Sequence, residues 1–217
     1  MNLFVGEISL NFSLSIYLVW LLPQLILNFK RQTTQGLSLS LHALLFTGYL
    51  SDLLYGFGCH MQWQYRMVTL IGLSCLIVQH FQFRYYGLAA NEKFGYLLFN
   101  IGIIIGSLTI LIILIHFKSN RLLFDSAGLI ANFCWFSYAF PQIIKNYRQQ
   151  STVALSLIFI ILGIISNICD TVSAWSLDWD YPSKIGAPIS LVENLILLIQ
   201  IRYYARSRVF KPMAINC

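Results

Sequence analysis

Long apolar runs, separated by short polar stretches, follow one another along the whole chain. Seven runs are long enough for membrane-spanning helices, since crossing the hydrocarbon core of a bilayer takes about 20 residues. These runs cover 8–29, 38–58, 64–84, 94–117, 125–145, 153–175 and 185–204. Helices are expected because a backbone exposed to lipid must satisfy its own hydrogen bonds. The pattern therefore predicts an all-α polytopic membrane protein with seven transmembrane helices.

The polar residues at the end of the first run recur at the end of the fifth. Residues 22–38 read LPQLILNFKRQTTQGLS, and residues 140–156, which lie 118 positions later, read FPQIIKNYRQQSTVALS. Each copy has Pro-Gln, Asn four residues after the Gln, cations, and a final Leu-Ser. The same offset relates Asp52 to Asp170. Spans 1–3 therefore repeat as spans 5–7, and span 4 is a connector.

Three helices per repeat determine how the two copies are related. A single extra helix between them lets both copies keep the same orientation, which predicts two parallel three-helix-bundle repeats joined by a connector helix. The expected divisions are 1–90 for the first bundle, 91–120 for the connector and 121–217 for the second bundle with a short tail. Transporters with internal repeats bind their solute between the halves, near the middle of the membrane.

Composition and charge agree with a membrane protein. The chain is 58% hydrophobic and 10% charged, against about 25% charged in soluble domains. The net charge of +6 predicts no nucleic-acid partner, because the cations cluster at helix ends. One side of the seven-span arrangement receives Lys30, Arg31, Arg84, Lys93, Lys145, Arg148, Arg202, Arg206, Arg208 and Lys211, and the other receives Arg66, Lys118, Arg121 and Lys184. This asymmetry predicts that the Pro-Gln loops and the C-terminus are cytosolic and the N-terminus is outside or luminal.

Two prolines lie inside helical runs, Pro23 followed by Gln24 and Pro141 followed by Gln142. Proline lacks an N–H and crowds the carbonyl four residues back, so each helix should kink. We expect the neighbouring Gln to donate a hydrogen bond to the carbonyl that is freed. Those carbonyls belong to Val19 and Ser137. The recurring pair predicts a hinge that gates the cytosolic side, and a static kink is the alternative.

Three carboxylates are candidates for proton coupling. Asp52 and Asp170 each stand 14 residues beyond the Ser that opens their helix, about 21 Å along its axis, and so in the outer half of the membrane. An intramembrane carboxylate is by default a functional candidate, and desolvation favours its protonated form. The alternative is that both are ordinary polar residues at the outer interface.

Glu193, the third carboxylate, lies with Asn194 near the middle of the seventh span. Their repeat partners are a cysteine and a leucine, so the repeat symmetry is broken there, as expected where two halves share one asymmetric ligand. Glu193 is therefore a candidate for a buried titrating group. The alternative is a structural carboxyl that is hydrogen-bonded to His80 or Gln79 in the third span.

Nothing in the sequence indicates a metal site, a cofactor or an enzyme. The five cysteines form no CxxC pair and have no metal-ligand spacing. His42, His80 and His116 lie in different spans without shared spacing, and no nucleophile–base pattern is present.

The doubled Pro-Gln motif resembles the PQ-loop family of seven-helix transporters over nearly the whole chain. Within that family the chain is most similar to cystinosin and the related lysosomal amino-acid transporters, on residues such as 36–38 (Gly-Leu-Ser) and 47–49 (Thr-Gly-Tyr). The resemblance implies a central cavity between two bundles, alternating access, and export of small polar solutes from an acidic lumen together with protons.

The resemblance also assigns individual residues. Asn146 and Lys184 match residues that the family uses near its amino-acid substrate, and the Asp of the seventh helix aligns with Asn194 or, one position off, with Glu193. Two departures concern cystinosin itself. Ser40 and Gly163 stand where its proton-handling Asp residues are expected, and Phe159 stands where an Asn is expected. Proton coupling would then fall to the three carboxylates named above.

Together, these observations predict a secondary transporter of a small amino acid, coupled to protons, in a lysosome-like or vacuole-like membrane. Carboxylates in the cavity favour a basic amino acid. A SWEET-like sugar carrier is the near alternative. A KDEL-receptor-like peptide receptor, which does not transport, is another, but it would require a cationic pocket, and the charges within these spans are mainly acidic.

Overall fold

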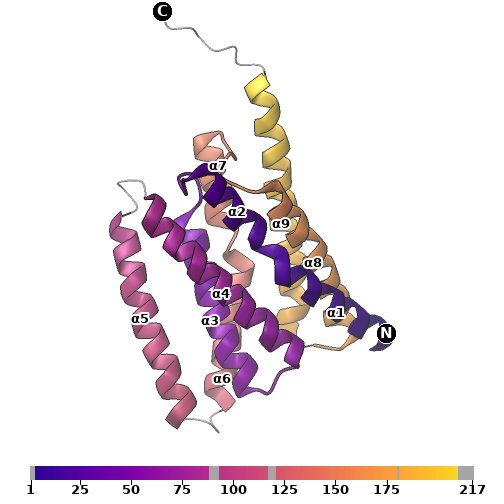
Figure 1. Cartoon of the computed structure of the whole chain (residues 1–217). Coiled ribbons are helices and arrows are strands. Elements are labelled where there is room, and N and C mark those ends of the chain that lie inside the picture. Colours follow the sequence, from indigo (N-terminus) through magenta and orange to yellow (C-terminus); the bar gives the residue numbers. More distant parts are fainter. Residues whose placement is uncertain (1–2, 88–92, 117–120, 180, 210–217) are drawn as a thin grey trace, which may run out of the picture.

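The computed structural model describes residues 3–87, 93–116, 121–179 and 181–209, and within these ranges all regular secondary structure is helical (Figure 1). The helices are α1 (Leu3–Trp20), α2 (Leu22–Arg31), α3 (Leu39–Gly58), α4 (Trp63–Tyr86), α5 (Lys93–His116), α6 (Arg121–Ser137), α7 (Phe140–Gln149), α8 (Leu157–Ser176) and α9 (Tyr181–Val209). They form seven long segments, because α1 with α2 and α6 with α7 are each one segment broken near its end.

Six of the seven segments are long and apolar enough to cross a membrane. They are Leu3–Arg31, Trp63–Tyr86, Lys93–Ile110, Arg121–Gln149, Leu157–Ser176 and Lys184–Ala205. The remaining segment, α3, has the same length as α8, 20 residues, but includes the buried polar residues His42 and Asp52. It packs between α4 and α6 inside the bundle. The predicted all-helical, multi-pass membrane fold is confirmed.

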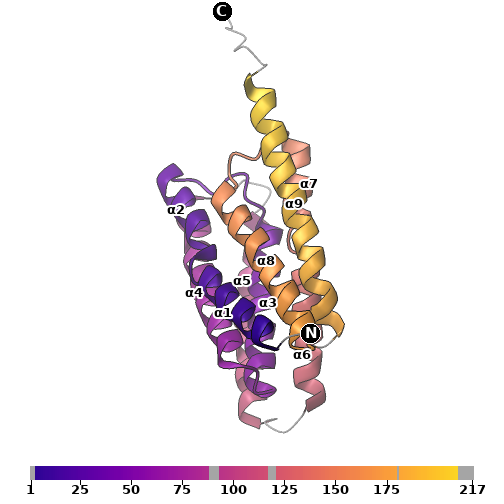
Figure 2. The same ribbon diagram turned by 90° about the vertical axis from the view of Figure 1, so that its right-hand side faces the viewer.

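The seven segments form two bundles of three and one outlying helix. The first bundle contains α1 with α2, α3 and α4, and the second contains α6 with α7, α8 and α9. At the interface between the two bundles, which we call the seam, α1 packs on α8 and α3 packs on α6. The repeat offset interchanges these two pairs. Helix α5 lies outside, against α3, as Figures 1 and 2 show. The predicted arrangement of two three-helix repeats and a connector is confirmed.

The loop after each Pro-Gln segment has the same local structure. Helices α2 and α7 are followed by the capping residues Gln32 and Gln150, whose backbones are left-handed with φ of 51° and 49°. The next helices begin at hydroxyl caps, since Ser38 Oγ and Ser156 Oγ accept hydrogen bonds from backbone N–H groups three residues on. The prediction that the sixth span begins at 153 was therefore wrong. It begins at Leu157, directly after the Ser156 cap.

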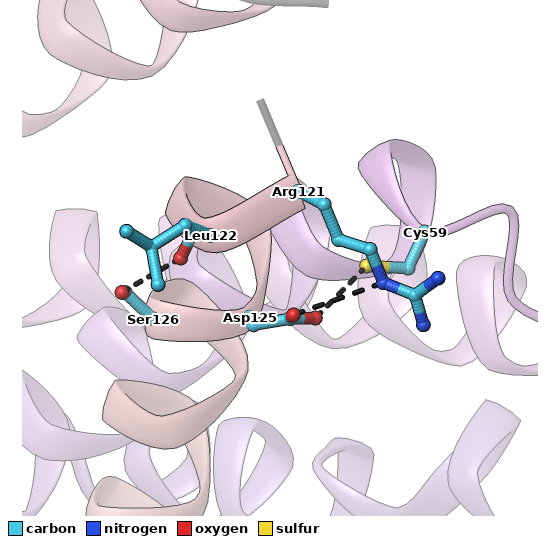
Figure 3. A network of polar contacts seen from close by, with 5 residues as sticks. All are labelled: Cys59, Arg121, Leu122, Asp125 and Ser126. Carbon is cyan, nitrogen blue, oxygen red and sulfur yellow. Dashed lines mark hydrogen bonds and ion pairs between the residues drawn. The ribbon is translucent and has the colours of Figure 1, made fainter. Parts of the chain in front are cut away.

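We call the end that holds Gln24 and Gln142 the PQ end, and the opposite end, where α1 begins, the N-terminal end. Figure 3 shows a link between the bundles at the N-terminal end, where Cys59 Sγ, directly after α3, donates to the Asp125 carboxylate of α6 at 3.7 Å. Asp125 also pairs with Arg121 at 3.8 Å. Lys118 and Lys211, which entered the charge comparison, lie outside the described residues.

A close contact inside the first bundle gives a stability prediction. A Cβ atom added to Gly72 of α4 would lie 2.2 Å from Cζ of Tyr49, a fully buried ring on α3. We expect Gly72→Ala to destabilise the fold by about 1–3 kcal/mol, which would lower the melting temperature by roughly 2–10 °C. Scanning fluorimetry of the purified protein would measure this shift.

The matched control is Gly102→Ala on α5, where a new Cβ atom would meet nothing within 4 Å. It should leave the melting temperature unchanged or slightly raised, because glycine weakens a helix interior. Equal melting temperatures for the two variants would contradict the predicted steric conflict.

Candidate functional site

A cavity of about 140 Å³ lies between the two bundles, in the half of the molecule nearer the N-terminal end. All six segments of the two bundles line it. Among its polar lining residues are Asp52 of α3, Asp170 of α8, and Asn132 and Asn167 of α6 and α8. Since one water takes up about 30 Å³ in the liquid, this volume corresponds to about five waters. The cavity therefore has room for one small solute.

The two aspartates are held in equivalent ways by the opposite bundle. Asp52 Oδ2 accepts a hydrogen bond from Trp135 Nε1 of α6 at 2.7 Å, and Asp170 Oδ2 accepts one from the Tyr17 hydroxyl of α1 at 2.7 Å. Tyr17 and Trp135 are themselves related by the repeat offset. Each carboxylate has a second donor, Tyr65 for Asp52 and Ser13 for Asp170. These donors fix both carboxylates at the cavity wall.

The charge of the cavity is one-sided. Two carboxylates line it, and none of its described lining residues is a Lys or an Arg. Asp52 is only 6% exposed. Because burying an ionised carboxylate away from water and without a cation is costly, this site favours the uptake of protons or of a positively charged solute.

Aromatic side chains lie between this cavity and the PQ end. Trp20 and Tyr138, one turn beyond the cavity-lining Tyr17 and Trp135, are 3% and 2% exposed. Their ring centroids are 6.5 Å apart, and Trp20 also stacks on Phe159 at 5.0 Å. These rings belong to one continuous buried cluster that extends to both Pro-Gln loops. The cavity is therefore closed on its PQ side.

A reciprocal hydrogen-bonded latch closes the PQ end itself. Gln24 donates to the Ala154 carbonyl at 2.8 Å and accepts from the Ser156 N–H at 2.9 Å, both in the loop of the other repeat. Gln142 makes the equivalent pair in the first loop, donating to the Gly36 carbonyl at 3.0 Å and accepting from the Ser38 N–H at 2.7 Å. Gln24 and Gln142 are 1% and 0% exposed. Each half thus binds the loop of the other half.

A further chain of amides connects each latch glutamine to its own bundle. Gln142 donates to Asn146 Oδ1 at 2.7 Å, and Asn146 donates to Gln200 Oε1 of α9 at 3.0 Å. Asn28 and Gln82 repeat this arrangement in the first bundle, with a bond of 2.9 Å between them. Asn146 is 1% exposed and does not line the cavity. Its contacts in this conformation are structural.

The prolines break their helices rather than only bending them. Leu21 separates α1 from α2, and residues 138–139 separate α6 from α7, so each Pro lies in the first turn of a new helix, as its second residue. The expected donation by Gln24 and Gln142 to the carbonyls freed by the prolines was wrong. Their amide N–H groups instead donate across the seam and to an Asn one turn on.

Glu193 and Asn194 lie on α9, beyond the cavity and close to the breaks. Glu193 is 2% exposed, and among the described residues no donor meets hydrogen-bond geometry with either carboxyl oxygen, although the Ala139 backbone is nearby. Asn194 donates to the Tyr138 hydroxyl at 2.6 Å. The alternative that placed His80 or Gln79 beside Glu193 was wrong, because those two side chains lie in the first bundle with other partners.

Lys184, the predicted substrate contact, is bound to Asp178 at the N-terminal end and is not a cavity-lining residue. Hydrogen bonding from its ammonium group lowers the pKa of the exposed Asp178 carboxyl. Lys184 Nζ also lies 5.7 Å from the centre of the Trp175 ring. The structure therefore brings together Asp52 and Asp170 but places Asn146, Lys184, Glu193 and Asn194 outside the cavity.

All four donors to the aspartates were missed from the sequence: Ser13, Tyr17, Tyr65 and Trp135. Aromatic residues are common in membrane helices, where packing or an interfacial position explains most of them. The signal that could have found two of them is the repeat offset, which places an aromatic residue with a polar hydrogen at both 17 and 135. In the folded chain each of these residues donates across the seam to the aspartate of the other bundle.

Comparison with known proteins agrees with this architecture. The family model described as "PQ loop repeat" matches residues 5–63 and 123–183. A curated relative, the vacuolar histidine transporter YPQ3 of Saccharomyces cerevisiae, is 35% identical over 82 residues, which are 38% of this chain and 28% of that protein. The chain thus matches little more than a quarter of the length of this relative.

Among solved structures, a eukaryotic SWEET transporter superposes with a TM-score of 0.67 at 13% identity, over 93% of this chain and 99% of that one. At this identity the likeness concerns the fold alone. The two matched regions each contain one Pro-Gln segment with its loop and following helix, and together they span more than half of the chain. This chain belongs to the PQ-loop repeat family.

Proposed function

We propose that this protein is a secondary transporter that carries a small amino acid across a membrane by alternating access, coupled to protons. The observation that supports this most directly is the cavity at the seam, which has one repeat-related aspartate on each wall and a closed PQ end. No Lys or Arg is found among its lining residues in the described part of the chain. A small cation or zwitterion entering from the N-terminal end would find an anionic, hydrogen-bonding site of suitable size.

The charge of the cavity favours a basic amino acid. One of the two carboxylates can accept the α-ammonium group or a cationic side chain while the other holds a proton. Solute and proton would then occupy the cavity together, which couples their movement in the same direction. The printed name of the yeast relative, a histidine transporter of the vacuole, agrees with this substrate class and with the membrane of an acidic compartment.

The roles of the other residues follow from their positions. Asp52 and Asp170 bind the solute or the proton, and Glu193, buried beyond the cavity, is a further proton acceptor during the conformational change. Gln24 and Gln142 hold the PQ end closed, and the breaks at Pro23 and Pro141 are the hinges that open it. Asn146, Lys184 and Asn194 would reach the solute only in another conformation.

The alternatives are weaker or more distant. A sugar carrier is favoured by the SWEET-like fold and by the amides of Asn132 and Asn167 in the cavity, which are suited to hydroxyl groups. A receptor for a peptide carboxylate is disfavoured, because no cation lines the cavity within the described residues.

Uptake into proteoliposomes tests the proposal. With an acidic outside, we expect accumulation of labelled arginine, lysine or histidine above the level of protein-free vesicles, and loss of most of it when a protonophore collapses the gradient. Labelled glucose serves as the comparison solute. Uptake of glucose but of no amino acid would favour the sugar carrier, and amino-acid uptake that is insensitive to the protonophore would remove proton coupling.

A further inference from the structure

A second hollow, separate from the transport cavity, runs between α4 and the outlying helix α5. Its volume is about 310 Å³, and none of its lining residues lines the cavity between the bundles. Helix α5 packs on α3, and its contact with α4 includes a side-chain pair in which His80 Nε2 lies 3.0 Å from Asn100 Oδ1. Figure 1 shows α5 as the outermost helix, so this groove faces the lipid.

The groove is polar at the PQ end and apolar toward the middle of the membrane. Arg84 lies in the last turn of α4, with His80 one turn deeper, and Tyr96 and Asn100 face them from the first turns of α5. Deeper in, the lining changes to isoleucine. These residues are Ile77, Ile103 and Ile104. This gradient matches the gradient from headgroup to acyl chain within one leaflet of a bilayer.

The polar end of the groove is also cationic. Arg84 is exposed, and among the described residues no Asp or Glu lines the groove. Lys93, the first residue of α5, is likewise exposed, one turn before Tyr96. Guanidinium groups bind phosphate oxygens in a fixed, bidentate geometry, and basic pockets between membrane helices are suited to anionic headgroups. Charge complementarity therefore indicates an anionic occupant at this end.

We propose that this groove binds an anionic phospholipid from the leaflet at the PQ end, with its phosphate at Arg84 and one acyl chain along Ile77 and Ile104. In the part of the chain that the structure describes, the second repeat has no equivalent site. Arg202 corresponds to Arg84 by the repeat offset, but His80 is replaced by Leu198, and no helix corresponding to α5 packs beside α9 among the described residues. The site is thus a property of the connector helix and does not depend on the transport proposal.

Lipid binding to the detergent-purified full chain tests this site, with bound lipids counted by native mass spectrometry during titration with phosphatidylglycerol or phosphatidylcholine. We expect the wild-type chain to prefer phosphatidylglycerol at one site by about fivefold, the equivalent of about 1 kcal/mol for one cation near a headgroup. Arg84→Gln should abolish the preference. Arg202→Gln, its repeat-related control, should retain it.

A second pair of variants tests the acyl chain. Ile104→Trp fills the apolar part of the groove and should remove the bound lipid, whereas Ile101→Trp, which is exposed on the same helix but does not line the groove, should not. Retention of the lipid preference in Arg84→Gln, or an equal loss in Arg202→Gln, would overturn the proposal. The proposal would also be overturned if the wild type had the mass of a dimer and Ile104→Trp had the mass of a monomer. A second copy of the chain, and not a lipid, would then cover the groove.

Discussion

Asp52→Asn and Asp170→Asn should each reduce pH-driven amino-acid uptake by at least about thirtyfold, since truncating one side of a buried charge interaction typically costs 2–5 kcal/mol. Asparagine keeps an oxygen that can accept from Trp135 or Tyr17, so the fold should persist. What is lost is the negative charge that a cationic solute or a proton neutralises. Initial rates in proteoliposomes, with an acidic outside, would measure the effect.

Asp125→Asn is the matched control, because Asp125 is an exposed carboxylate whose partners, Cys59 and Arg121, lie outside the cavity. Its uptake should stay within about twofold of the wild type, as expected for an exposed ion pair. A variant that loses pH-driven uptake but still exchanges solute across the membrane would identify the proton site. Uptake at the wild-type rate in either cavity variant would contradict the assignment of that aspartate.

The fold could be predicted because its main constraints are polar residues at membrane depth. An apolar composition alone does not produce a Pro-Gln pair, an Asn, a Leu-Ser and an Asp at one constant offset, so the recurrence established the repeat, and the repeat required a connector. The same reasoning placed Asp52 and Asp170 at equivalent heights. The cavity between them follows from packing two such bundles face to face.

The partners of the polar residues could not be predicted, because they lie on the other repeat. Gln24 binds a loop that is 130 positions away in the sequence, whereas proline chemistry suggested a partner within its own helix. Asn146 resembles a substrate contact by family pattern, yet in this conformation it links α7 to Gln200. A periodic pattern shows that such a residue is buried, but only the docking of the two bundles determines which atom it meets.

The second large effect concerns the latch at the PQ end. In Gln142→Leu, the Ser38 N–H and the Gly36 carbonyl lose their partner and stay buried while the end is closed. Each unsatisfied backbone group costs about 1–3 kcal/mol. This cost applies only to the closed state, because water can hydrogen-bond to the N–H and to the carbonyl when the end opens. The balance should therefore shift toward the state open at the PQ end by at least about thirtyfold, or about 2 kcal/mol.

Thiol labelling would measure this shift. Ala139→Cys places a small thiol at a fully buried position beside the break, in a chain whose native cysteines are replaced by serine. A membrane-impermeant maleimide should label it faster by a similar factor in Gln142→Leu and, by the repeat symmetry, in Gln24→Leu.

Gln32→Leu is the control for this experiment, because Gln32 is exposed and its amide, among the described residues, donates to the Phe29 carbonyl of the preceding helix and not across the seam. Its labelling rate should equal that of the parent chain. If all three variants label alike, the cross-repeat bonds do not hold the end closed, and the closure must rest on the aromatic cluster of Trp20, Tyr138 and Phe159. An increase confined to the two latch variants would instead show that a pair of side chains, each bound to the opposite half, sets which face of the cavity is open.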